Sequence, residues 1–187
     1  MAIKTGQTNS FSPNTQAKSG EVNTNFTEIW SEVQFIGFRV RQSANQEDLA
    51  DGATEVQFDT EDFDVGSNFD TGTYKFTAPY DGYYWFHAQV IWVSAEGDNF
   101  RYDVRLYHND AFTSVGRIAG GLVTSGNDAD NRYPVPQTTQ ICALSAGDTM
   151  GVYGFKDTEG GNTGDIYKSS YGEFGHFMGY ILARNDY

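Results

Sequence analysis

Residues after Phe35 alternate between apolar and polar side chains with a period of two. In residues 84–92 and 102–106 every second side chain is apolar or aromatic, which is the pattern of a half-buried strand. Three more segments have β-type composition: 137–144, 150–153 and 177–183. Gly-rich turns separate these segments, so the sequence predicts an all-β head domain over residues 35–187, a β-sandwich or jelly roll. Three polar, acidic segments are predicted to be long loops: 43–54, 118–133 and 156–170.

One segment, residues 19–34, has the period of a helix instead. Its apolar residues fall on one stripe of an α-helix: Val22, Phe26, Ile29, Trp30 and Val33. Ser19 can cap the first turn. A helix of this length is marginal alone, so the stripe needs a partner. That partner is either the chain's own β domain or the same helix of other copies, where it would start a trimer.

Residues 1–18 are polar and contain only two bulky apolar anchors, Ile3 and Phe11. Such a segment cannot bury enough apolar area to order itself. It is either a disordered tail or an extended arm that docks on another protein, and we adopt the second interpretation. The first residues lack the apolar centre of a signal peptide, so synthesis in a cytoplasm is expected.

Composition supports the β assignment and narrows the partners. The chain of 187 residues has 14 Phe, 12 Tyr and 21 Gly, which favours strands joined by turns. Its net charge of −13 disfavours nucleic acid or an anionic membrane as a partner. Cys142 is the single cysteine, so an intrachain disulfide is excluded, and its apolar strand predicts a buried, inert thiol.

Residues 58–88 resemble the signature of the globular head of complement component one-q, whose jelly-roll fold is shared by the tumour-necrosis-factor cytokines. Seven signature positions match: Phe58, Asp64, Phe69, Phe76, Gly82, Tyr84 and Phe86. Ala88 stands where the signature has an aromatic residue. Four further segments resemble the family's first strand, central hairpin, characteristic turn and closing strand: 38–41, 106–110, 144–148 and 177–182.

The resemblance implies a homotrimer of jelly rolls that binds proteins or glycans through exposed loops and is not an enzyme. The seven matching residues are then core and turn positions and not a binding site. Many members of the family hang from a collagen stalk, but this chain contains no Gly-X-Y repeat. A short helix and a polar arm stand in that place.

The run from Ser19 to Trp30 resembles segments of bacteriophage fibre and virion surface proteins. This match is short and adds to the resemblance of residues 58–88 to the one-q head. Together the two resemblances predict a trimeric knob that is made in the host cytoplasm and attached to a virus particle by its N-terminus.

Residues that could support catalysis or metal binding have simpler interpretations in this sequence. His87, His108 and His176 are dispersed, with no second ligand at zinc spacing, so ordinary strand histidines are favoured. The chain has no Gly-x-Ser-x-Gly elbow and no P-loop, which disfavours an enzyme. Acidic residues cluster at 59–64, 127–130 and 157–165. They offer the oxygen ligands that calcium takes, but a solvated acidic surface is the simpler interpretation, and no cofactor is predicted.

Two functions follow from these patterns. The first is a non-enzymatic virion protein that decorates a capsid or forms a short head fibre, with residues 1–18 on another virion protein. The alternative is a receptor-binding protein at a tail or fibre tip that recognises a host-surface glycan or protein. A third hypothesis is a free recognition module secreted by a cell, which the missing signal peptide disfavours.

Overall fold

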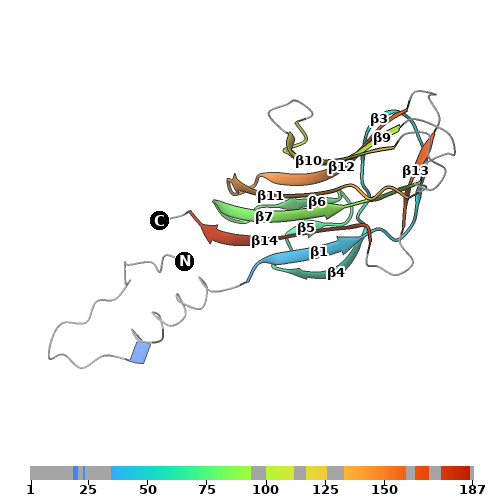
Figure 1. Cartoon of the computed structure of the whole chain (residues 1–187). Coiled ribbons are helices and arrows are strands. Elements are labelled where there is room, and N and C mark those ends of the chain that lie inside the picture. Colours follow the sequence, from blue (N-terminus) through green and yellow to red (C-terminus); the bar gives the residue numbers. More distant parts are fainter. Residues whose placement is uncertain are drawn as a thin grey trace. The chain divides into compact units, whose positions relative to one another are not determined.

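The computed structural model describes residues 35–93, 100–111, 117–125, 133–158, 163–168 and 174–185, together with residues 19, 20 and 23. The chain divides into two units, Met1–Phe35 with Tyr187, and Ile36–Asp186. In the second unit the described residues are built from strands (Figure 1). The predicted all-β fold is confirmed.

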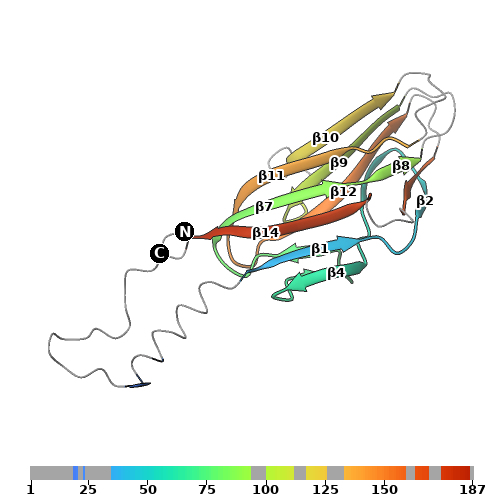
Figure 2. The same ribbon diagram turned by 60° about the horizontal axis from the view of Figure 1, so that its bottom comes forward.

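The first sheet has five antiparallel strands in the order β11-β7-β14-β1-β4 (Figure 2). Their bounds are β1 Gly37–Arg41, β4 Thr60–Val65, β7 Gly82–Gln89, β11 Gln137–Leu144 and β14 His176–Arg184. The order places the first and last strands of the domain side by side at its centre, as a jelly roll does. Buried and exposed side chains alternate along β7, as its period-two pattern requires.

The second sheet has the order β10-β9-β12-β6-β5, and a sixth strand, β3, also pairs with β12. Its strands are β3 Gly52–Glu55, β5 Phe69–Asp70, β6 Lys75–Thr77, β9 Phe100–His108, β10 Arg117–Ser125 and β12 Thr149–Thr158. Strands β10 and β11 belong to different sheets and contact each other (Figure 2). This contact links the two sheets along one side.

A third, small sheet has the order β2-β13-β8. It consists of β2 Gln46–Leu49, β8 Ile91–Val93 and β13 Gly164–Tyr167. The segments 43–54, 118–133 and 156–170 were predicted to be loops, and that prediction is wrong in part because β2, β3, β10, β13 and the end of β12 lie within them. Strands β2 and β3 lack apolar alternation and are held mainly by pairing with β13 and β12. Strand β13 is short, but its Ile166 is fully buried in the core.

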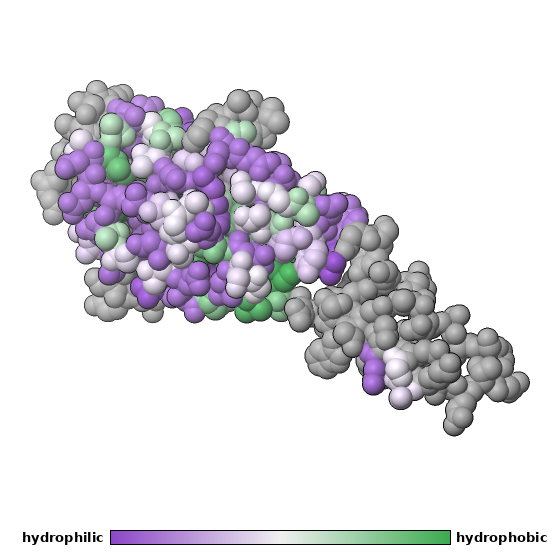
Figure 3. Space-filling model, turned by 180° about the vertical axis from the view of Figure 1, so that it is seen from behind, coloured by the Kyte–Doolittle hydropathy of each residue, from purple (hydrophilic) through white to green (hydrophobic). Residues whose placement is uncertain are grey.

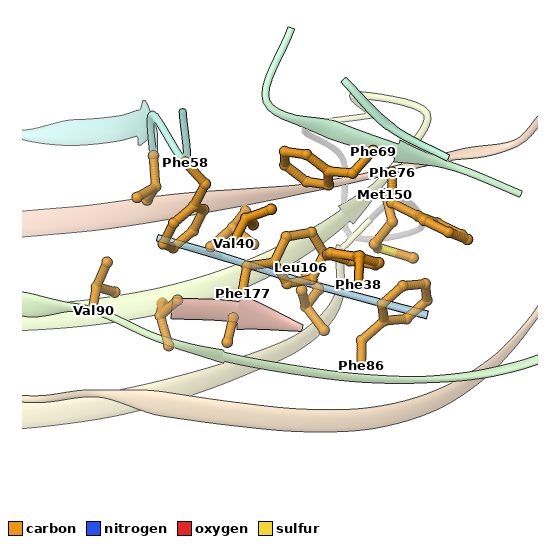
Figure 4. Close-up of a cluster of buried hydrophobic side chains, with 14 of the residues drawn as sticks. Phe38, Val40, Phe58, Phe69, Phe76, Phe86, Val90, Leu106, Met150 and Phe177 are labelled. Atoms are coloured by element: carbon orange, nitrogen blue, oxygen red, sulfur yellow. The ribbon is translucent and has the colours of Figure 1, made fainter. Parts of the chain in front are cut away.

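The core lies between the two large sheets and is aromatic (Figure 4). Phe38 of β1 is central: its ring centroid lies 4.9–5.1 Å from the centroids of Phe69, Phe76 and Phe177. Leu106 and Met150 meet these rings from the second sheet. Offset and edge-on contacts at this spacing stabilise a core beyond the area they bury.

Candidate functional site

The five-stranded sheet has one face on the core and one face directed away from it. On β7 the side chains of Tyr84, Phe86 and Ala88 are buried, so those of Trp85 and His87 point outward. The register between strands extends this assignment across the sheet. We call the outward side chains of these five strands the outer face.

The outer face is apolar at the end where β1 begins. One cross-strand row runs Ile141, Trp85, Tyr180, Gly37, Val65. The Trp85 and Tyr180 rings pack with centroids 5.1 Å apart. Ile141 is 55% exposed and Tyr83, on the same strand as Trp85, is 48% exposed. Exposed apolar side chains gathered in this way on one face mark an interaction surface.

The outer face becomes polar toward its other end. The next row runs Thr139, His87, Met178, Arg39, Phe63, and the row after it runs Gln137, Gln89, His176, Arg41, Thr60. Asp62 pairs with both arginines, at 3.2 Å from Arg39 Nη1 and 2.8 Å from Arg41 Nε. The face is therefore graded from apolar to polar along the strands.

The second sheet presents a different surface. Its outward residues on β9 form an ion cluster in which Asp103, only 5% exposed, accepts hydrogen bonds from Arg101 and Arg105. The Arg105 guanidinium lies 3.7 Å from the centroid of the Phe155 ring. These charges satisfy one another within the chain. Hydrophilic residues predominate on the side of the molecule seen in Figure 3.

A second polar cluster joins four strands or turns of this sheet. Lys75 Nζ lies 2.7 Å from Asp110 Oδ2 and 3.3 Å from Glu55 Oε1. The Tyr153 hydroxyl lies 3.0 Å from Asp110 Oδ1 and 3.2 Å from Glu55 Oε1, so its one hydrogen is shared between the same two carboxylates. Burial, and then the two carboxylates, raise the pKa of Tyr153 well above its usual value, so the phenol stays a donor. The polar groups of this cluster bind one another and hold these strands together.

The outer face brings together two of the three histidines. The rings of His87 and His176 have centroids 5.2 Å apart. His87 Nδ1 lies 2.8 Å from the Thr139 hydroxyl. Burial lowers the pKa of His87. His108 lies elsewhere, with Nε2 3.0 Å from Asp148. The sequence interpretation missed the pair, because the two residues are distant in the chain and only the pairing of β7 with β14 unites them.

The seven signature residues occupy the positions of a folding core. The side chains of Phe58, Phe69, Phe76, Tyr84 and Phe86 are all buried. Asp64 Oδ2 accepts a hydrogen bond from the Phe69 amide at 2.9 Å, so this carboxylate stabilises the turn between β4 and β5. A Cβ at Gly82 would lie 2.5 Å from the Ala183 carbonyl oxygen, which explains why only glycine fits.

The predicted arm and the predicted apolar stripe of the helix lie outside the described residues. This applies to Ile3 and Phe11 and to Val22, Phe26, Ile29, Trp30 and Val33. Ser19, Gly20 and Asn23 are described and have helical backbone. The anchoring role of 1–18 and the trimer-starting role of 19–34 stay predictions.

The carboxylates of residues 59–64 go to separate partners and do not converge. Asp59 accepts from the backbone and hydroxyl of Ser43, Asp62 pairs with arginines, and Asp64 binds a backbone amide. Among the described residues no group of three or more His, Cys, Asp or Glu is placed to hold a metal ion. Residues 127–130 lie outside the described part of the chain. Cys142 packs against the core but is only partly buried, so the predicted full burial is wrong. Its partial burial raises the pKa of the thiol to about 11, as expected of an unreactive cysteine.

A third feature is a set of aromatic side chains beside the small sheet. Tyr133 is 57% exposed and its ring centroid lies 6.2 Å from that of Tyr167. Phe174 is also exposed, and the next residue, Gly175, lies beside the Tyr167 carbonyl. We call Tyr133, Tyr167 and Phe174 the aromatic patch. The exposed rings of Tyr133 and Phe174 offer flat apolar surfaces to a partner.

The fold and its two unlike sheets define a jelly-roll β-sandwich of the tumour-necrosis-factor type. Residues 37–182 match the C1q domain family, so the chain belongs to that family. The globular domain of the zebrafish complement 1qA protein is similar, with a TM-score of 0.56 and 20% identity over 81% of this chain and 100% of that one.

Two cytokine structures share the fold at lower identity. The Eiger TNF of S. frugiperda has a TM-score of 0.58 and 14% identity over 82% of this chain and 96% of that one. Murine APRIL has a TM-score of 0.56 and 13% sequence identity over 80% of this chain and 100% of that one. No curated protein sequence is significantly similar to this chain. The described residues contain no helix that is long and apolar enough to cross a membrane.

Proposed function

We propose that this chain is a non-enzymatic virion protein: a trimeric jelly-roll knob that decorates a bacteriophage capsid or forms a short head fibre. Membership of the C1q domain family supports the knob. The resemblance of residues 19–30 to phage fibre and virion surface proteins supports the assignment of the protein to a virion. Residues 1–18 attach the knob to another virion protein in this proposal.

The main support for a trimer is the difference in polarity between the outward faces of the two large sheets. The outer face exposes an apolar row from Ile141 to Val65, whereas the second sheet neutralises its own charges. Burying the apolar row against other copies is favourable, at about 25 cal/mol per Å². Because each chain has a net charge of −13, copies repel at long range, so apolar contacts have to drive association.

A matched pair of variants tests this interface. Tyr83 belongs to the outer face and Tyr133 to the aromatic patch, and both are about half exposed. Tyr83→Asp places a charge in the proposed interface, so we expect the trimer to dissociate into folded monomers. Tyr133→Asp adds the same charge elsewhere and should leave the trimer intact. The readout is mass by light scattering, with circular dichroism as the control for folding.

The same experiment has a clear opposite outcome. If Tyr83→Asp stays trimeric at all concentrations, the outer face is not the interface. If both variants dissociate, charge itself and not the position controls assembly. Deleting residues 1–18 should abolish attachment to the particle but leave the trimer, and loss of the trimer would refute the role of these residues as an anchor.

The aromatic patch favours a second candidate function, recognition of a host-surface glycan at a tail or fibre tip. Aromatic rings stack on the apolar faces of sugar rings, and Tyr133 and Phe174 are exposed for such contact. The double variant Tyr133→Ala, Phe174→Ala should then lose binding to host cells while remaining trimeric. Copy number separates the two functions, because a capsid decoration is present in many copies per particle and a tip adhesin in few.

A further inference from the structure

The histidine pair of the outer face has the arrangement of a metal-binding site. His87 on β7 and His176 on β14 are diagonal neighbours, because His176 pairs with Gln89 and His87 pairs with Met178. Both side chains lie on the outer face, and their ring centroids are 5.2 Å apart. The His87 ring also stacks on Trp85, with ring centroids 6.0 Å apart, and His176 is buried, so packing holds both rings against the sheet.

The spacing of the rings suits two ligands of one ion. A zinc–nitrogen bond of about 2.0–2.1 Å places each imidazole centroid roughly 3.2 Å from the ion. Two such centroids at a tetrahedral angle are then about 5.2 Å apart. The observed separation of 5.2 Å matches this value.

The hydroxyl of Thr139 provides the support that metal-bound histidines commonly have. It lies 2.8 Å from His87 Nδ1. When Nδ1–H donates to this oxygen, Nε2 carries the lone pair and its direction is fixed. Thr139 and His87 face each other directly across β11 and β7, so the contact follows from the register of the sheet.

The surrounding charges are balanced in part. Arg41 is the cross-strand partner of His176 and Arg39 that of Met178, and Asp62 forms ion pairs with both arginines. The remaining positive charge disfavours a bound cation, so coordinate bonds from the imidazoles have to outweigh it. This selects an ion that binds nitrogen strongly over calcium, which prefers oxygen ligands.

We propose that His87 and His176 bind one borderline divalent ion, such as Zn²⁺, on the outer face. Because no third His, Cys, Asp or Glu of the described residues joins the group, water or the same face of another copy completes the coordination. The site is built from one chain, so its existence does not depend on the proposed trimer.

Titration of the full, untagged chain with ZnCl2 in a calorimeter tests the proposal. We expect His87→Ala and His176→Ala each to weaken zinc binding by at least about tenfold. His108→Ala is the matched control, because His108 lies on the second sheet beside Asp148. It should bind zinc like the unmodified chain. Thermal denaturation of each variant without zinc verifies folding.

Thr139→Val provides a test that leaves both rings in place. Loss of its hydroxyl should weaken zinc binding by about tenfold or more, because outer-shell partners hold the ligand in position. The proposal is overturned if the unmodified chain does not bind zinc, or if binding survives in both His87→Ala and His176→Ala. Equal losses in His108→Ala would likewise contradict it, since they would indicate general binding to histidine.

Discussion

A buried lysine offers a direct test of what stabilises the end of the sandwich that lies next to the small sheet. Lys156 of β12 is fully buried, and its Nζ lies 2.6 Å from Asp51 Oδ1. Asp51 is 37% exposed and stands directly before β3. A Cβ at Gly164 of β13 would meet the Lys156 stem at 2.9 Å, so the lysine lies under the small sheet. The ion pair therefore joins the start of β3 to β12, and the lysine stem packs against β13.

The two partners are unequally buried, so their removal has unequal costs. Asp51→Ala leaves a buried ammonium without this carboxylate. Breaking a buried pair costs about 3–5 kcal/mol, and the partial exposure of Asp51 reduces our expectation to about 2–3 kcal/mol. Lys156→Met leaves a carboxylate that water can reach and fills a similar volume. We expect it to cost less than about 1 kcal/mol.

Urea denaturation at one fixed protein concentration measures these free energies of unfolding. The double variant should resemble Lys156→Met alone, which gives a coupling energy of about 2–3 kcal/mol between the two residues. The reasoning is refuted if Asp51→Ala costs less than about 1 kcal/mol, or if Lys156→Met is the more damaging change. Either result would mean that the charge is not what makes this position sensitive.

Three further predictions concern the core, a turn and acid stability. Phe38→Ala should lower the free energy of unfolding by about 3–5 kcal/mol in urea, and a loss below about 1 kcal/mol would contradict its central position. Gly82→Ala should lower the melting temperature in a thermal scan, because the new Cβ would meet the Ala183 carbonyl at 2.5 Å; an unchanged temperature would show that the strand end yields. The hydrogen bond from the side chain of Asn109 lowers the pKa of Asp148 below 3.8, so this carboxylate stabilises the fold above that pH and the stability is lost as pH falls through the lowered pKa. Asp148→Asn should flatten the acid limb of a plot of urea midpoint against pH, and an unchanged limb would assign that loss to other carboxylates.

Much of the sandwich follows from the period-two pattern, because its long strands bury one face each. Phe86 and Leu106 lie in such strands, and both reach the core as predicted. The small sheet could not be found in this way. Strand β2 reads Gln-Glu-Asp-Leu, and its place depends on β13, more than a hundred residues later.

The candidate site was predictable only in part for the same reason. Alternation along β7 implies that Trp85 faces away from the core, but not that Ile141 and Tyr180 lie beside it. The histidine pair depends on the register between β7 and β14, which no local pattern of residues encodes. The family signature marks core positions such as Phe76, and it is silent on the outer face.

The mass of the full chain in solution tests the central claim most directly. We predict that light scattering on the unmodified protein gives the mass of three chains across a tenfold range of concentration. A mass of one chain throughout that range would contradict the account, because the apolar row of the outer face would then remain in contact with water.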